Sequence, residues 1–294
     1  MKKLLFIYNS KAGKGKIRNN LQDIIEIFTR AGYEVTARPT LKGTDAKELA
    51  ENKSKDFDLV VCSGGDGTMD GVITGMLNAP VKKPIGYIPA GSTNDFAVSL
   101  KIPKEMKKAA QNAVRGKSFL CDMGRFNDDY FMYIAAFGLF TDVSYETPQE
   151  IKNVLGHTAY ILGGVKSLLS IPTFSIRVKA DGREIEGEYM YGMITNSVSV
   201  GGFKNVTGPS VKLNDGLFEV TLIKKPKSPM DLQKIISALL GKEIENDYIC
   251  CFKASHIEVE SKKEIAWTLD GEFGGNHKCV EIDNLPQALE IIVP

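Results

Sequence analysis

Hydrophobic and polar residues follow two alternating patterns in the first third of the chain. Short apolar runs, such as Leu59–Cys62, are typical of fully buried strands. Between them, apolar residues recur every three or four positions, as expected for amphipathic helices. The alternation predicts a parallel sheet with helices on both faces. The predicted strands are Leu4–Tyr8, Tyr33–Arg38, Leu59–Cys62 and Ile85–Ile88, and the predicted helices are Asn19–Arg30, Thr44–Glu51, Met69–Leu77, Asp95–Leu100 and Glu105–Arg115.

The pattern changes from about Phe119 onward, where short strand-like runs are separated by turn residues. Asp181-Gly182 is a hairpin signal between two of them. The predicted strands are Phe131–Phe137, Ser175–Ala180, Gly187–Asn196, Phe218–Ile223, Ala254–Val259 and Cys279–Ile282, interrupted by helical stretches at His157–Leu169 and Met230–Leu240. We therefore expect an N-terminal parallel-sheet α/β domain over 1–122 and a C-terminal antiparallel β-sandwich domain over 123–285. The last residues, 286–294, could close the second domain or return to the first.

Composition narrows the class of protein. The 294 residues carry a net charge of +1, so no strong field favours nucleic acid as a partner. The 5 cysteines form no C-x-x-C pair, which predicts reduced, buried thiols in a cytosolic protein and makes zinc an unfavoured ligand. No apolar run approaches the roughly 18 residues of a membrane span, so any lipid contact is expected to be peripheral.

The stretch Ser63–Gly71 (SGGDGTMDG) is the first candidate site, because glycines after a strand expose backbone N–H groups that suit a phosphate. It matches neither the Walker A pattern nor the Rossmann fingerprint, since Asp70 stands where the latter needs its third glycine. The carboxylate of Asp66 would repel a phosphate unless a metal lay between them. The loop alone is compatible with nucleotide phosphates plus Mg²⁺ and equally with a tight structural turn.

Three further loops follow the other predicted strands. They are the basic loop Asn9–Gly15, the segment from Thr40 to Asp45, and the string Pro89–Ala97. Because the carboxyl ends of parallel strands share one edge of a sheet, these loops favour one ligand site over unrelated turns.

The combination of N-x-x-A-G (from Asn9), G-G-D-G-T (from Gly64), P-A-G-S-T-N-D-F-A (from Pro89) and L-D-G-E (from Leu269) resembles the diacylglycerol kinase catalytic family. That family includes bacterial soluble lipid kinases and sphingosine kinases. The motifs span nearly the whole chain. G-G-D-G-T alone also occurs in NAD kinases and phosphofructokinase-like enzymes, whereas its combination with Asn94–Ala97 is more specific.

The resemblance implies a set of site residues. Ser92 stands where the family usually has threonine, and the hydroxyl group is kept. Asp66, Asp95 and Asp122 would organise Mg²⁺ and its waters, although Asp122 read alone is a loop cap. The implied ATP-binding residues are Asn9, Lys11, Gly13, Thr40, Gly64, Gly65, Asp66, Gly67, Thr68, Ser92 and Asn94.

Two Asp-Gly pairs acquire roles through the same resemblance. Asp270 would be the catalytic base, and Glu272 would position the metal or the substrate. Asp215, with the carbonyls of Lys212 and Leu217, would hold a second, structural Mg²⁺. Read alone, each pair is a plain hairpin turn.

The expected activity is ATP- and Mg²⁺-dependent transfer of phosphate to a lipid hydroxyl group, with diacylglycerol the favoured acceptor. The lipid would be presented at a membrane surface, and the protein would be cytoplasmic and transiently at the inner face of the membrane. The chain could also form a homodimer. Ala159–Leu169 could line the lipid cleft or simply pack on its own domain. The alternatives are a NAD-kinase-like phosphotransferase, which is not expected to carry Pro89–Ala97, and a catalytically silent nucleotide-binding regulatory protein, which need not keep Asp270 and Glu272.

Overall fold

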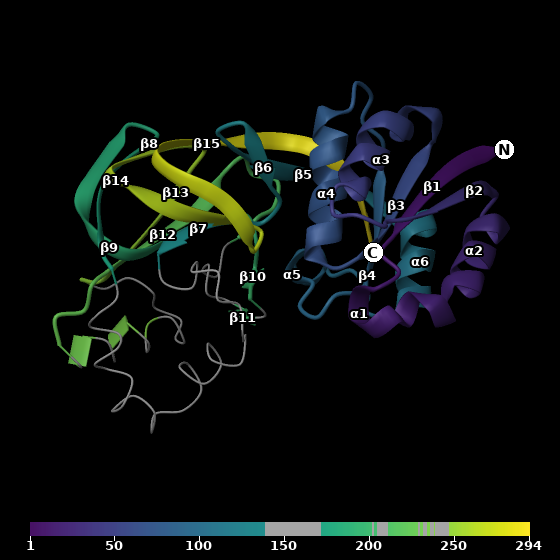
Figure 1. The fold of residues 1–294 in the computed structure, drawn as a ribbon, viewed down its shortest axis with the longest axis horizontal. Helices are drawn as coiled ribbons and strands as arrows, with labels where there is room; N and C mark the ends of the chain where they lie inside the picture. Colours follow the sequence, from purple (N-terminus) through teal and green to yellow (C-terminus); the bar gives the residue numbers. More distant parts are fainter. Residues whose placement is uncertain are drawn as a thin grey trace.

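The computed structural model describes residues 1–138, 172–201, 203–204, 211–228 and 247–294, together with positions 230, 231, 234, 235 and 238. An α/β unit built on a parallel sheet stands beside a unit of antiparallel strands, and the long strand β15 runs across both (Figure 1). The predicted fold class, an α/β domain followed by a β-sandwich domain, is confirmed. The predicted helix at His157–Leu169 lies outside the described residues, as does about half of Met230–Leu240.

The strands of the α/β unit run parallel in the order β4–β3–β1–β2. Every residue of β3 and β4 is buried, because helices cover both faces of the sheet. The elements are β1 (Lys2–Tyr8), α1 (Ala12–Gly15), η1 (Lys16–Asn19), α2 (Leu21–Arg30), β2 (Tyr33–Pro39), α3 (Asp45–Lys53), η2 (Ser54–Asp56), β3 (Leu59–Gly64), α4 (Asp66–Asn78), β4 (Ile85–Pro89), α5 (Asp95–Ser99) and α6 (Met106–Arg115).

The second unit is antiparallel, in the order β13–β12–β9–β7–β14–β15. Asp181 and Gly182 form the predicted hairpin turn between β8 and β9, and both have positive φ, as a type I′ turn requires. The elements are β5 (Lys117–Phe126), β6 (Asp129–Phe131), β7 (Ile134–Gly138), β8 (Phe174–Ala180), β9 (Arg183–Thr195), β10 (Ser199–Val200), β11 (Phe203–Lys204), β12 (Phe218–Lys224), β13 (Ile249–Ala254), β14 (His256–Leu269) and β15 (Glu272–Val293).

The end of the chain returns to the first unit. β15 begins as the hairpin partner of β14, continues along β5, and reaches β4 through the parallel pair Ile291 and Ile85. The C-terminus accordingly lies within the α/β unit in Figure 1. The predicted boundary between residues 122 and 123 falls inside β5.

Three predicted features differ in the structure. Helix α4 begins at Asp66 rather than Met69, because an aspartate in the first turn suits the positive end of the helix dipole. Its glycines do not break it: a side chain on Gly75 would collide with the carbonyl of Lys47 on α3, at 2.3 Å, so glycine permits close helix packing. The predicted strand Phe131–Phe137 is divided into β6 and β7. The cysteines are only partly as predicted: Cys62 and Cys121 are buried, Cys250 and Cys251 are partly exposed, and Cys279 is exposed.

Candidate active site

The loops at the carboxyl ends of β1, β3 and β4 pack directly on one another. The Asn9 amide donates to Oγ1 of Thr68, at 3.3 Å, which joins the first loop to the start of α4. Gly13 has a φ of +55°, and a Cβ there would lie 2.1 Å from the carbonyl oxygen of Ala90. The second half of the basic loop Asn9–Gly15 is folded into α1, and the loop packs on the segment after β4.

The loop after β3 and the loop after β4 meet at two glycines, Gly65 and Gly91. A Cβ on Gly91 would lie 2.6 Å from the Cα of Gly65. The side chain of Asn94, which has a left-handed backbone, accepts from the Gly91 amide and donates to the Gly91 carbonyl, both at 2.8 Å. Tyr87 donates to the carbonyl of Gly64 at 3.2 Å. The glycines thus allow two phosphate-type loops to touch through their backbones.

A methyl group at Gly91 has no space, so Gly91→Ala is expected to force the two loops apart. We expect a loss of about 1–3 kcal/mol in the free energy of unfolding, measured by urea denaturation. Gly43→Ala is the matched control, since a Cβ at Gly43 meets no atom within 4 Å. Equal midpoints for the two variants would show that the contact between Gly91 and Gly65 leaves room for a methyl group.

Asp66 and Asp95 lie close together at this edge. The Asp66 carboxylate accepts backbone N–H groups from the start of α5, while its Oδ1 atom is buried without a hydrogen-bond partner among the described residues. Burial, and then the charge of Asp95, raise the pKa of Asp66 to about 6. Asp95 is itself 2% exposed and accepts from the Ser199 hydroxyl at 2.6 Å. Oxygen ligands of this kind fit a hard divalent cation.

Asp270 and Gly271 form the two-residue turn between β14 and β15. Their φ values of 51° and 91° identify a type I′ turn, so the hairpin interpretation of this Asp-Gly pair is confirmed. The same turn also presents a buried carboxylate, because Asp270 is only 5% exposed. Glu272, at the first position of β15, is exposed, and its Oε1 lies 3.5 Å from where a Cβ on Gly67 would stand.

The backbone between β6 and β7 binds the carboxylate of Asp270. Oδ2 accepts the Met132 N–H at 2.5 Å, and Oδ1 accepts those of Tyr133 and Ile134 at 3.0 Å. Burial raises the pKa of Asp270 to about 7, the three N–H groups oppose the shift, and the charge of Asp66 adds to it. The pKa of the candidate base therefore lies near neutral pH and depends on the charge of Asp66 in the neighbouring loop.

Asp70 is a site residue that the sequence pattern did not reveal. Its carboxyl group is hydrogen-bonded to that of Asp270. Burial first, and then the negative charges of Asp270 and Glu272, raise the pKa of Asp70 well above its usual range. A hydrogen bond between two carboxyl groups requires a proton on one of them. Asp66 and Asp70 are four residues apart on one helical face, a signal hidden by starting the predicted helix at Met69.

Asp122 has a different set of contacts from Asp66 and Asp95. It is completely buried, and its oxygens accept the backbone N–H groups of Gln287 and Gly216, each at 2.7 Å. It therefore joins β15 to the turn that contains Asp215, as a capping residue would. Its place in a Mg²⁺ and water network stays a prediction from the resemblance.

The remaining predicted nucleotide contacts lie on the same edge. Thr40 follows β2, and its N–H donates to the Tyr8 carbonyl at 2.9 Å. Lys11 and Ser92 are exposed, and the Lys11 N–H donates to the Asn9 side chain at 2.9 Å. Gly67 is exposed at the N-terminus of α4, as a phosphate contact would require.

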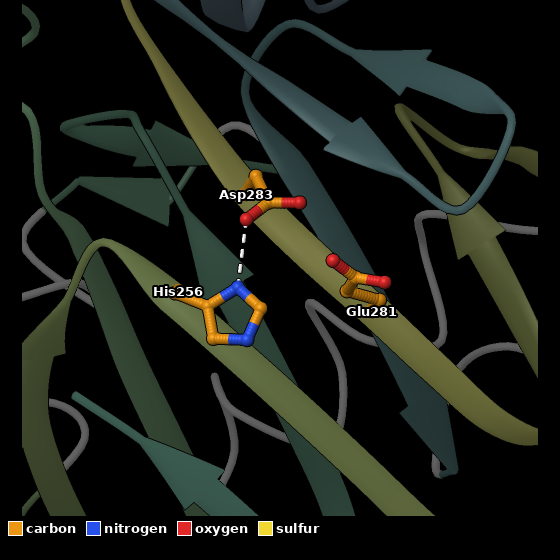
Figure 2. Close-up of side chains that lie close together, drawn as sticks. All are labelled: His256, Glu281 and Asp283. Carbon is orange, nitrogen blue, oxygen red and sulfur yellow. Dashed lines mark hydrogen bonds and ion pairs between the residues drawn. The ribbon is translucent and has the colours of Figure 1, made fainter. Parts of the chain in front are cut away.

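A second group of titratable side chains lies on the outer face of the sandwich. His256, Glu281 and Asp283 offer ligand atoms within 4.8 Å of one another, and Figure 2 shows His256 directed at Asp283. Arg125 already pairs with both carboxylates, at 2.5 Å to Asp283 and 3.7 Å to Glu281. The hydrogen bond to Asp283 raises the pKa of His256. Protein cations thus satisfy this group as a surface ion-pair network.

Comparisons with known proteins agree with this geometry. The family model described as the diacylglycerol kinase catalytic domain matches residues 3–126, and the model described as the YegS C-terminal NAD kinase beta sandwich-like domain matches residues 137–293. The diacylglycerol kinase of Bacillus subtilis strain 168 is 34% identical, over 100% of this chain and 97% of that protein. The diacylglycerol kinase of Staphylococcus carnosus strain TM300 is 31% identical, over 100% and 95%.

A solved structure also matches this chain over its whole length. A crystal structure of a candidate diacylglycerol kinase from Bacillus anthracis strain Sterne has a TM-score of 0.84 at 26% identity, covering 100% of this chain and 97% of that one. Within the described part of the chain, no helix is long and apolar enough to cross a bilayer. The chain belongs to the diacylglycerol kinase family and is a kinase whose acceptor is a lipid hydroxyl group.

Proposed function

We propose that this kinase transfers the γ-phosphate of ATP to the hydroxyl group of diacylglycerol and forms phosphatidic acid. The observation that carries the proposal is the convergence of carboxyl groups on the glycine loops. The charge of Asp95 raises the pKa of Asp66, and the charge of Asp66 raises the pKa of Asp270. The names of the relatives support diacylglycerol as the acceptor.

The ATP phosphates would lie on the loops at the strand ends. The N–H groups at the start of α4 and the positive end of its dipole favour an anion there. Lys11 is exposed on the adjoining loop and supplies a positive charge. The other proposed contacts are Asn9, Gly13, Thr40, Gly64, Gly65, Thr68, Ser92 and Asn94.

The residues present fit a catalytic Mg²⁺. Asp66 offers a buried oxygen without a hydrogen-bond partner among the described residues, and Asp95 lies beside it. When bound, Mg²⁺ would neutralise the charge on the phosphate oxygens. These two carboxylates would hold the metal directly or through its waters.

Asp270 would act on the acceptor. Its carboxylate takes the proton of the lipid hydroxyl group as that oxygen forms its bond to the γ-phosphorus, and the bond to the ADP oxygen breaks. The three backbone N–H groups fix the direction of the carboxylate. Asp70 holds it from the other side with a hydrogen bond, and Glu272 borders the open side of the site.

The pKa of Asp270 predicts the pH dependence of the reaction. A base must be deprotonated, and burial places the pKa of Asp270 at about 7. Plots of log kcat/KM against pH are therefore expected to be flat above that pH and to fall with unit slope below it. A profile that stays flat down to pH values near 5 would mean that Asp270 does not titrate in the reaction.

The lipid is proposed to reach the site from a membrane surface, with peripheral contact by the protein. A transient position at the inner face of the membrane and a homodimer stay predictions, as does the absence of a nucleic-acid partner. The predicted lining segment Ala159–Leu169 lies outside the described residues.

Release of ADP measures the proposed reaction. We expect ADP release to require ATP, Mg²⁺ and diacylglycerol in mixed micelles together, and EDTA to stop it. Release that depends on NAD in place of the lipid would identify a NAD-kinase-like enzyme. No release with a panel of lipid alcohols would favour a silent regulatory protein.

A further inference from the structure

Backbone and carboxylate groups of the protein anchor the turn before β12. The Asp122 N–H donates to the Leu213 carbonyl at 2.9 Å, and its carboxylate accepts the Gly216 N–H at 2.7 Å. Asp215 Oδ1 accepts the N–H of Leu217 at 3.3 Å. These hydrogen bonds close the turn with groups of the protein itself.

The acidic groups at this turn already have a cation. Lys253 on β13 lies directly opposite Glu219 on β12. Its ammonium nitrogen is 3.1 Å from Oδ2 of Asp215 and 3.0 Å from Oε1 of Glu219. Glu219 is 7% exposed. Burial raises the pKa of its carboxyl group to about 7, and the hydrogen bond and charge of Lys253 oppose that rise.

A divalent cation would compete with this lysine for the same oxygen. Mg²⁺ binds carboxylate oxygens at about 2.0–2.1 Å and demands near-octahedral geometry. An ammonium group in contact with Oδ2 of Asp215 would repel it. The remaining oxygen of Asp215 already accepts the N–H of Leu217. The Asp215 carboxylate, in contact with Lys253 and with the N–H of Leu217, therefore does not fit the structural Mg²⁺ that the family resemblance implies at Lys212, Asp215 and Leu217.

We propose that Lys253 is a built-in cation that replaces a structural metal at this turn. Its ammonium group links the turn to β12 and β13 through its contacts with Asp215 and Glu219. The lysine thereby supplies permanently the charge that a bound ion would supply only when the metal is abundant. This role is independent of the proposed reaction.

Thermal unfolding without ATP tests the proposal. Melting temperatures would be measured in excess Mg²⁺ and in EDTA for the wild type, Asp215→Asn, Lys253→Met and Lys253→Arg. Any Mg²⁺ effect that arises at Asp66 and Asp95 is common to all four proteins. We expect Asp215→Asn to show the same Mg²⁺-dependent shift as the wild type. We expect Lys253→Met to melt a few degrees lower in EDTA, with Lys253→Arg close to the wild type.

The same variants test whether Lys253 takes the place of a Mg²⁺ ion at Asp215. Without the ammonium group, Asp215 is free to bind a cation, so Lys253→Met should gain a Mg²⁺-dependent stabilisation that the double variant Lys253→Met/Asp215→Asn lacks. Metal content after dialysis against Mg²⁺ gives a second readout and should be equal for the wild type and Asp215→Asn. A wild-type shift or bound metal that Asp215→Asn removes would overturn the proposal, as would a Lys253→Met variant as stable as the wild type in EDTA.

Discussion

Asp270→Asn is expected to slow lipid phosphorylation by about 10²–10⁴-fold, the usual contribution of a general base. The amide cannot accept the proton of the lipid hydroxyl group, so the loss should fall on kcat. ATP binding, measured by calorimetry, should remain, because the nucleotide loops keep their own contacts. The variant should also lose some stability, since an NH₂ group cannot accept the N–H of Met132.

Asp181→Asn is a closely matched control. Asp181 also opens a two-residue Asp-Gly turn with a positive φ, and its carboxylate also accepts backbone N–H groups, from Ser255 and His256. It lies at the β8–β9 turn, outside the proposed site. Rates per folded molecule should be normal in Asp181→Asn. Equal rates in both variants would remove Asp270 from the chemistry.

Asp66→Asn is expected to reduce activity by about 10–100-fold at limiting Mg²⁺. The substitution removes a negative charge beside Asp95 while leaving one oxygen to accept the N–H groups at the start of α5. Excess Mg²⁺ should restore part of the rate, because the defect lies in metal affinity. The measurement is the rate as a function of Mg²⁺ concentration at saturating ATP.

Asp45→Asn controls for the loss of an aspartate at a helix start. Asp45 begins α3 and accepts the N–H groups of Leu41 and Lys42, which precede that helix. Asp66 likewise begins α4 and accepts backbone N–H groups, in its case from the start of α5. Its substitution should leave the Mg²⁺ concentration for half-maximal rate unchanged. A similar change in both variants would mean that Asp66 acts through folding and not through the metal.

Hydrophobic patterning predicted the α/β unit closely, because buried parallel strands and amphipathic helices have distinct periods. It failed where long-range contacts decide the backbone. The strand predicted over Phe131–Phe137 is broken because three of its N–H groups bind Asp270, which is more than 130 residues away in the sequence. The pairing of β15 with β4 is likewise a long-range choice that a local pattern does not contain.

The loops of the candidate site and three of its carboxylates could be predicted, but not every contact between its charged groups. Motifs identified Asp66, Asp95 and Asp270, and parallel-strand topology placed the loops together. Asp70 was missed because the predicted helix began at Met69, which hid its spacing from Asp66, and because its contact with Asp270 joins distant parts of the sequence. The contact between Lys253 and Asp215 depends on the pairing of β12 with β13.

The fate of the γ-phosphate tests the central claim most directly. Labelled ATP and Mg²⁺ would be incubated with the protein and an equimolar mixture of dioleoylglycerol, sphingosine, phosphatidylglycerol and NAD, and the labelled products separated and identified by mass. We predict that the label appears in phosphatidic acid, with one ADP formed for each. Label in NADP, or in none of the four acceptors, would contradict the assignment of this site as a diacylglycerol kinase centre.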